Sequence, residues 1–219
     1  MKALKTQFPD SNRVKLLEGQ LYEAEGKNPL GIYEAILEAD PSNVTAMKRR
    51  VCVYRAQNNN RLAVRELNAY LSLYSTDSSA WQELTQLYIE QEKLELAKFC
   101  VEELILLHPE NYLYHLQYAE LCHSISISTN KDSHDNRELA KQYYAQALEL
   151  KPHNNLRALY GLCTSLRSES KQKKKQEETR KFEKTYTRLV TRLLDTYTTE
   201  GSPEHLKNLV YKTFRTEEL

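Results

Sequence analysis

The sequence has little of the two residues that most often interrupt regular structure. Five glycines and six prolines in 219 residues are too few for the many tight turns of a β-sandwich or a β-barrel. Leu, Glu, Lys, Ala and Gln are abundant instead, and all five favour helices. We therefore expect an all-α protein.

Other absences limit the possible functions. No apolar run approaches the roughly 20 residues of a membrane span, and the N-terminal residues lack the apolar segment of a signal peptide. The formal net charge of +1 gives no overall attraction to nucleic acid or anionic lipid. The four cysteines, Cys52, Cys100, Cys122 and Cys163, form no CxxC pair. We expect reduced thiols, as in the cytosol or nucleus, rather than disulfides or a zinc site.

Catalytic motifs are missing as well, since the chain contains no GxGxxG, P-loop, HExxH or GxSxG sequence. Cys122 and His123 are adjacent, so on a helix they project about 100° apart and do not face one metal. The glutamate pairs at 102–103 and 177–178 fit solvated helix faces. We predict a protein that is not an enzyme and that binds no cofactor and no metal.

What the sequence does contain is a 34-residue repeat. This step relates Pro41 to Pro109 through one intermediate unit, and it relates Tyr54 to Tyr88 and then to Cys122. Thirty-four residues is the period of the tetratricopeptide repeat. Such a unit is a pair of antiparallel helices, and neighbouring units must stack because one pair cannot bury both of its faces. The predicted fold is a tetratricopeptide-repeat solenoid.

Residues 78–111 fit this repeat best. Trp81 takes the large position of the first helix, Tyr88 the aromatic position and Pro109 the end of the unit. Ala97 lies where the two helices cross, and a larger side chain there would overpack the contact. Over the whole array, the predicted structural positions are Gly19, Tyr33, Ala63, Trp81, Tyr88, Ala97, Pro109, Ala119, Ala140, Tyr144, Ala147 and Pro152.

The repeat also sets the predicted boundaries. Residues 1–12 resemble the end of a repeat whose first helix is missing, so we expect a shortened form of a longer protein. Residues 13–168 make an array of about four to five units, with a polar, loop-like insertion at residues 124–136. A charged linker follows at residues 169–180, and residues 181–219 are expected to be C-terminal capping helices.

The turn at residues 26–29 is about two residues shorter than the standard one, and Pro29 fits the first position of the next helix. Charge also changes sharply along the chain. Residues 44–77 carry six basic and two acidic side chains, whereas residues 78–111 carry two basic and seven acidic ones. We expect charge reversal at residues 48–50 to weaken assembly with partners without loss of helicity. The lysine-rich residues 171–175 fit either an anion-binding patch or a solvated linker.

In a stacked array, the inward positions of the first helices line an extended concave surface that can bind protein. The candidate groove residues are Lys48, Arg49, Cys52, Arg55, Gln82, Gln86, Ile89, Leu116, Glu120 and His123. Tyr112, Tyr114 and Tyr118 are not explained by the repeat and are candidate surface anchors, because tyrosine is frequent at protein interfaces.

Several stretches carry more than the repeat pattern. They include FPDSNRVKLLEG, YEAILEADPSN, AWQELTQLYI, LAKFCVEELILLHPENYLYHLQYAE and YYAQALELKPHNNLRALYGL. Together they resemble the family of subunit two of the endoplasmic reticulum membrane protein complex, over about residues 8–162. LAKFCVEEL and LYHLQYAE are the most specific, since they include positions that the repeat does not dictate.

The resemblance implies a peripheral scaffold on the cytosolic face of the reticulum membrane. It implies that the protein holds other subunits of the complex together, and so supports insertion of tail-anchored and multi-pass membrane proteins. The implied partners are the cytosolic parts of the membrane-embedded subunits and a second cytosolic subunit. It implies no nucleic acid and only indirect contact with the membrane.

Two alternatives remain at this point. A co-chaperone would clamp an acidic C-terminal peptide with lysine and asparagine at paired groove positions. Of the corresponding sites here only one is basic and none is asparagine; these sites include Leu16, Gln20, Lys48, Cys52, Gln82 and Gln86. An RNA-associated helical-repeat protein would rest on the basic second unit and the lysine-rich segment.

Overall fold

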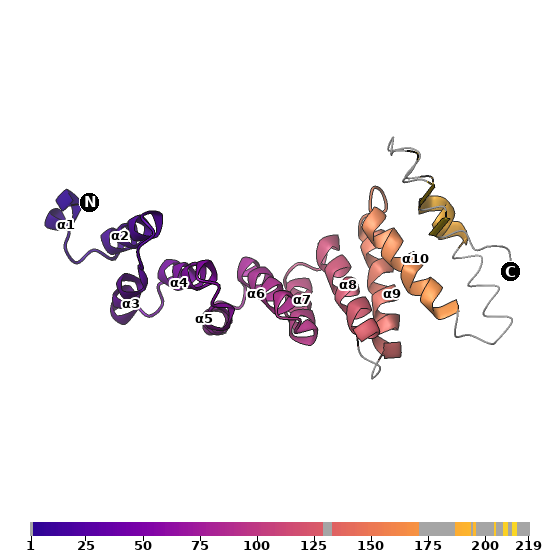
Figure 1. Cartoon of the computed structure of the whole chain (residues 1–219), viewed down its shortest axis with the longest axis horizontal. Coiled ribbons are helices and arrows are strands. Elements are labelled where there is room, and N and C mark those ends of the chain that lie inside the picture. The colour runs from indigo at the N-terminus through magenta and orange to yellow at the C-terminus, as the bar shows by residue number, and fades with distance from the viewer. Residues whose placement is uncertain are drawn as a thin grey trace. The chain divides into compact units, whose positions relative to one another are not determined.

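The computed structural model describes residues 2–128, 133–170, 187–193, 195, 204, 208–209 and 212–213. All regular structure within these residues is helical, which confirms the predicted fold class (Figure 1). The chain forms two compact units, Met1–Gln91 and Glu92–Leu219, and each is described here by itself.

The first unit contains six helices, and successive helices from α2 to α6 pack against one another. Their bounds are α1 (Lys2–Gln7), α2 (Asn12–Ala24), α3 (Leu30–Ala39), α4 (Val44–Ala56), α5 (Asn60–Leu73) and α6 (Ser78–Glu90). Three of these helices begin at a residue whose side chain accepts a hydrogen bond from the first turn. Asn43 caps α4, Asn59 caps α5 and Asp77 caps α6, so short polar residues fix where the helices start.

The helix pair α2–α3 shows why small residues recur at the crossings. Tyr33 is fully buried, and a Cβ atom at Gly19 would lie 2.5 Å from Cε1 of its ring. The glycine therefore lets the two helices approach. The turn between them contains Gly26 at a φ of +71°, a left-handed conformation that glycine adopts without strain. Helix α3 begins at Leu30, with Pro29 preceding it as the cap rather than as its first residue.

The second unit contains α7 (Leu94–Leu107), α8 (Tyr112–Ser128), α9 (Ser133–Leu150) and α10 (Leu156–Ser170). Helix α8 contacts α7, α9 and α10, and α9 also contacts α10. Residues 187–193 are helical, and Val190 and Leu193 among them are buried. Helix α10 includes residues 169 and 170, and the lysine-rich part of the predicted linker and most of the predicted capping segment lie outside the described residues.

The described residues of the expected loop-like insertion, 124–128 and 133–136, are helical, because α8 runs to Ser128 and α9 starts at Ser133; residues 129–132 lie outside the described part of the chain. Ile125 is buried one turn beyond the buried Cys122, so the apolar face of α8 continues into this segment. The serines do not end the helix because their hydroxyls bond back to its carbonyls, a local pattern that satisfies them inside a helix. Ser124 donates to Glu120 at 2.8 Å, and Ser126 donates to the carbonyl of His123 at 2.7 Å.

The predicted structural positions mostly lie inside the two units. Buried members are Gly19, Tyr33, Ala63, Trp81, Tyr88, Ala97, Ala119, Ala140, Tyr144 and Ala147. Pro109 and Pro152 are exposed and follow the ends of α7 and α9. Two of the three tyrosines expected on the surface are buried instead, Tyr114 at 7% and Tyr118 at 4% exposure. None of the helices among the described residues is both long and apolar enough to cross a membrane.

Candidate protein-binding site

In the first unit, the basic side chains of α4 are already paired with acidic side chains of neighbouring helices. Arg49 contacts Glu23 of α2 at 3.1 Å, and Arg50 contacts Glu66 of α5 at 3.2 Å. Lys48 pairs with Asp77, the residue that caps α6. Arg49 and Lys48 therefore connect α4 to the neighbouring repeats, whereas Arg50 joins the two helices of its own repeat.

Arg55 completes this set. Its guanidinium lies 3.0 Å from a carboxylate oxygen of Glu83 and 3.7 Å from one of Glu90, so it links α4 to α6. Within the first unit, a basic side chain of residues 44–77 thus pairs with acidic side chains of the next repeat. The side chains of Lys48 and Arg49 remain 40% and 39% exposed within these ion pairs, so the expectation that a partner reads residues 48–50 stays a prediction. The pairing weakens the RNA alternative, which assumed free basic side chains in the second repeat.

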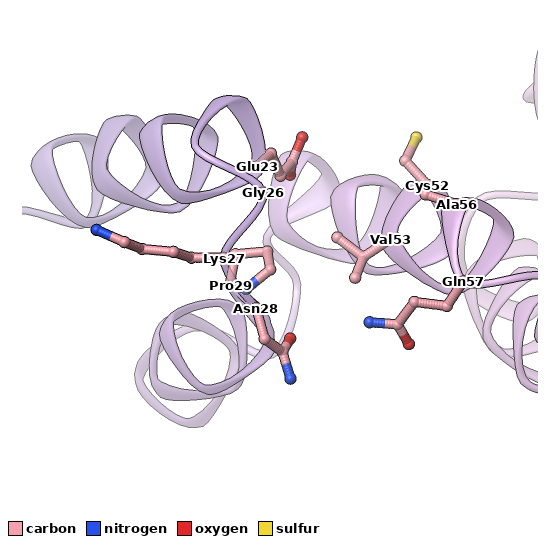
Figure 2. Close-up of a pocket in the computed structure, with 9 residues that line it drawn as sticks. All are labelled: Glu23, Gly26, Lys27, Asn28, Pro29, Cys52, Val53, Ala56 and Gln57. Atoms are coloured by element: carbon pink, nitrogen blue, oxygen red, sulfur yellow. The ribbon is translucent and has the colours of Figure 1, made fainter.

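A hollow of about 440 Å³ opens beside the short turn that joins α2 to α3 (Figure 2). Its lining residues are Glu23, Gly26, Lys27, Asn28, Pro29, Cys52, Val53, Ala56 and Gln57. Pro29 and Val53 are buried and give it an apolar base, whereas Asn28 and Gln57 add amide groups. Gly26 has open space where a Cβ atom would be, so the short turn leaves this volume unfilled.

The charges around this hollow are compensated. The hydroxyl of Tyr33 donates to one carboxylate oxygen of Glu23 at 2.5 Å, while Arg49 donates to the other at 3.1 Å. Burial and the hydrogen bond to Glu23 raise the pKa of Tyr33. Burial, followed by the nearby Glu83, raises the pKa of the Cys52 thiol, so this exposed cysteine is protonated at neutral pH. In Figure 2, Lys27 points away from the other labelled residues.

A second hollow, of about 530 Å³, lies in the second unit between α8, α9 and α10. Its lining residues are Glu120, His123, Tyr144, Leu156, Arg157, Tyr160, Gly161 and Thr164. Arg157 donates two hydrogen bonds to the carboxylate of Glu120, at 2.5 and 2.7 Å. This bidentate geometry orients both side chains at the mouth of the hollow.

His123 is a half-buried polar residue of the second hollow. Its Nδ1 atom lies 3.3 Å from the hydroxyl of Ser165, which is fully buried. Burial, with a smaller effect from Arg137, lowers the pKa of His123. The ring is therefore neutral at pH 7 and can accept or donate one hydrogen bond to a bound segment.

The structure separates the ten predicted groove residues into different roles. Cys52 lines the first hollow, and Glu120 and His123 line the second. Gln82 and Gln86 are exposed, and Ile89 is half-buried. Leu116 is only 3% exposed, so its prediction as a groove residue is wrong: helix α8 packs against three other helices, and that position faces the core. The remaining predicted residues, Lys48, Arg49 and Arg55, are held in ion pairs.

Sequence reasoning missed residues on both hollows. The groove positions proposed above cover the second to fourth repeats, and Arg157 and Tyr160 belong to the fifth. Asn28 and Gln57 belong to turns rather than to inward helix positions, although the shortened turn at residues 26–29 was a usable signal. Among the described residues, no group of three or more His, Cys, Asp or Glu side chains is placed to hold a metal ion.

These helix pairs define a tetratricopeptide-like repeat protein. Residues 133–154 match the tetratricopeptide repeat, and residues 3–131 match the EMC2 TPR-like repeat domain. The chain therefore belongs to the EMC2 TPR-like repeat family, and the resemblance seen in the sequence is confirmed.

Curated relatives agree with this assignment. ER membrane protein complex subunit 2 of Xenopus tropicalis is 42% identical over 167 residues, covering 75% of this chain and 54% of that protein. The Dictyostelium discoideum subunit 2 is 33% identical over 178 residues, covering 75% of this chain and 53% of that protein. The chain thus spans about half the length of the curated relatives it matches.

Solved structures show the same fold at low sequence identity. A crystal structure of YrrB, described as a TPR protein with an unusual peptide-binding site, has a TM-score of 0.63 at 15% identity, covering 97% of this chain and 96% of that one. A crystal structure of MamA has a TM-score of 0.61 at 15% identity, covering 88% and 95%. At this identity the similarity shows the fold alone.

Proposed function

We propose that the chain is a non-catalytic scaffold subunit of the endoplasmic reticulum membrane protein complex. The observation that carries this proposal is the 42% identity over 167 residues to a protein named as subunit 2 of that complex. Within the proposal, the chain lies peripherally on the cytosolic face of the membrane. It supports insertion of tail-anchored and multi-pass proteins by holding the cytosolic parts of other subunits, including a second cytosolic subunit.

The geometry supports binding of protein segments rather than chemistry on a substrate. Each unit has its own hollow, in which apolar side chains lie beside polar groups at fixed positions, and the second hollow adds two tyrosines; this mixture is typical of a recognition site. The acidic lining residues of the two hollows, Glu23 and Glu120, each pair with an arginine of a neighbouring helix, and Lys27 of the first hollow pairs with Glu25. Uncharged or weakly charged segments are therefore the expected ligands of the hollows.

The co-chaperone alternative gains no support from the structure. Its carboxylate clamp requires free basic side chains in the groove, and Lys48, the one basic residue among those sites, is paired with Asp77. A synthetic peptide that ends in acidic residues should therefore bind the purified chain no better than the same peptide with an amidated, uncharged end.

Affinity purification tests the scaffold proposal. The tagged chain is expressed in cells, the membranes are solubilised in a mild detergent at physiological salt, and co-purified proteins are identified. We expect the other subunits of the complex to be recovered. Recovery of none of them would overturn the proposal.

A matched pair of variants tests the second hollow. Arg157→Ala with Tyr160→Ala removes two of its lining residues, whereas Arg65→Ala with Leu73→Ala removes an arginine and an apolar residue from the exposed side of α5. We expect the first pair to reduce recovery of complex subunits and the second pair to leave it unchanged. Equal recovery from both pairs would show that partners do not use this hollow.

A further inference from the structure

Helix α7 carries an apolar stripe on the face opposite to its buried one. Ala97, Cys100, Val101 and Leu104 are buried in the core. Leu96, Phe99 and Leu106 are instead 46%, 52% and 76% exposed. At about 100° per residue, these three side chains fall within roughly 80° of one another around the helix axis.

The stripe is long enough to seat a second helix. From Leu96 to Leu106 it extends about 15 Å at the rise of an α-helix, which corresponds to two to three turns of a partner. Exposed apolar side chains that are scattered singly need no explanation, but a line of them on one helix face marks an interaction surface. None of the three lines either hollow, so the stripe is a separate surface.

Acidic side chains lie beside and within this stripe. At about 100° per residue, Glu95 lies roughly 20° beyond Leu106 at one edge, whereas Glu103 lies inside the stripe, about one turn before Leu106. Glu92 and Glu110 lie just before and just after the helix. Among the described residues, none of these four carboxylates forms an ion pair or a hydrogen bond. This contrasts with Glu23, Glu83 and Glu120, which are all held by an arginine.

The charge around the stripe decides which kind of partner fits. Carboxylates without a counterion repel the phosphates of RNA and of anionic lipids, and they also disfavour a second copy of the same face. They attract lysine and arginine, whereas the leucines and the phenylalanine require apolar contacts. A helix with apolar residues at i, i+3 or i+4, and i+7 and basic residues on both flanks meets both requirements.

We propose that the stripe Leu96–Phe99–Leu106 on α7, with its flanking glutamates, is a docking surface for a basic amphipathic helix of a partner protein. This adds a site to the scaffold function proposed above and rests on that function only for the existence of such a partner. The apolar contacts provide the affinity, and the carboxylates provide the selection for basic flanks and faster association.

Binding of a designed peptide to the full chain tests the proposal. The probe is a fluorescent 18-residue helical peptide of leucine and lysine with one apolar stripe, and the control is a scrambled peptide of the same composition without a stripe. Fluorescence anisotropy should show binding of the first peptide that is at least about tenfold tighter than of the second, since two to three buried leucines are worth that much. Binding that does not distinguish the two peptides would overturn the proposal.

Variants then locate the site on the chain. Leu96→Ser with Leu106→Ser should weaken binding of the striped peptide about tenfold or more, and Leu73→Ser with Leu113→Ser, two other exposed leucines, should not change it. Glu95→Gln with Glu103→Gln should weaken binding by a few-fold and flatten its salt dependence. Glu34→Gln with Glu38→Gln on α3 removes the same charge from another exposed helix face and should do neither.

Circular dichroism keeps these results interpretable, because the substituted side chains are exposed, except for the half-buried Glu103, and every variant should keep wild-type helicity. If both leucine variants weaken binding equally, the stripe is not the site. A concentration-dependent dimer of the wild-type chain that Leu106→Ser abolishes would assign the stripe to a second copy and overturn the proposal. If the peptide binds through α7 while affinity purification recovers no complex subunit, the docking surface stands and the scaffold proposal falls.

Discussion

Glycine residues in helices show how one missing side chain can set the distance between two elements. A Cβ atom at Gly161 would overlap the ring of Tyr144, which is only 3% exposed. At Gly31, also in a helix, a Cβ atom would meet nothing within 4 Å. The same residue type is therefore required for packing at one position and is only a weak helix former at the other.

The two glycines should respond oppositely to the same substitution. Gly161→Ala should lower the free energy of unfolding by about 1–3 kcal/mol, because the ring of Tyr144 must shift in a packed core. Gly31→Ala should leave stability unchanged or raise it by up to about 1 kcal/mol, because alanine favours the helix. Urea denaturation followed by circular dichroism measures both, and equal effects would contradict the close packing at Gly161.

Asp77 is a single residue that caps a helix and joins two repeats. Its carboxylate accepts hydrogen bonds from the backbone of Ser79 at 3.0 Å and from the hydroxyl of Tyr70 at 2.7 Å, and it pairs with Lys48. Burial alone would raise its pKa, but the hydrogen bonds from Lys48, Ser79, Tyr70 and Ala80 outweigh that effect and hold the pKa well below its usual range.

This lowered pKa predicts a stability that depends on pH. Because the folded chain binds the proton less readily than the unfolded chain, the contribution of Asp77 is complete above about pH 4 and is lost as the pH falls further. The difference in unfolding free energy between wild type and Asp77→Asn should therefore be largest at pH 5–7 and shrink toward pH 2. Asp10→Asn, at an exposed position, is the control. A difference that stays constant with pH would show that Asp77 does not contribute through its charge.

At the scale of the elements, the long helix pair α8–α9 departs most from the regular repeat. The additional residues lengthen both helices, and they are fixed by contacts with the rest of the second unit. Asn136, at the start of α9, is buried and accepts a hydrogen bond from Lys98 of α7 at 3.1 Å. The segment looked like a loop in the sequence because serine and asparagine are turn formers, but tertiary contacts override this weak preference.

Two isoleucines in residues 124–128 test directly whether this segment is helical. Ile125 is 1% exposed and Ile127 is 73% exposed, although they are two residues apart. Ile125→Ala should lower the unfolding free energy by about 2–5 kcal/mol, because it removes buried methyl groups and leaves a cavity. Ile127→Ala should change it by less than about 0.5 kcal/mol. Similar small effects from both substitutions would mean that the segment is a loop after all.

At the scale of the whole molecule, a net charge of +1 conceals charges that are sorted between neighbouring repeats. In the first unit this sorting produces ion pairs between successive first helices, such as Glu23 with Arg49 and Glu83 with Arg55. In the second unit the acidic residues beside and within the α7 stripe have no such ion pair among the described residues. The ion pairs of the first unit hold neighbouring repeats together. The glutamates of the α7 stripe remain available for the proposed basic helix.

Swapping the charges of Glu23 and Arg49 tests whether their ion pair stabilises the fold or whether Arg49 binds a partner. Arg49→Glu alone should lower the unfolding free energy by about 1 kcal/mol, since it places two carboxylates together at a partly exposed site. Glu23→Arg with Arg49→Glu should recover part of that loss. It will not recover all of it, because the hydroxyl of Tyr33 also donates to Glu23. Thermal or urea unfolding measures both variants.

The recovery of complex subunits should follow stability in this series. If Arg49→Glu leaves the unfolding free energy unchanged but abolishes recovery of subunits in affinity purification, Arg49 contacts a partner and the ion pair with Glu23 is incidental. The same comparison decides the earlier expectation for residues 48–50, which assumed a free basic surface.

The sequence by itself determined the helical class, the 34-residue period and the family. These depend on local patterns: apolar residues at helical spacing, small residues at crossings and a proline at the end of a repeat. Their physical causes act within one or two turns of the chain, so they can be read without coordinates.

Only the tertiary structure decided which side chains remain available for partners. The pairing of Arg49 with Glu23 and of Arg157 with Glu120 joins residues 26 and 37 positions apart. Burial of Leu116, the helical state of residues 124–128 and both hollows likewise depend on how neighbouring helices pack. A groove residue that the repeat predicts becomes part of the core, an ion pair or an open surface according to contacts that no local pattern specifies.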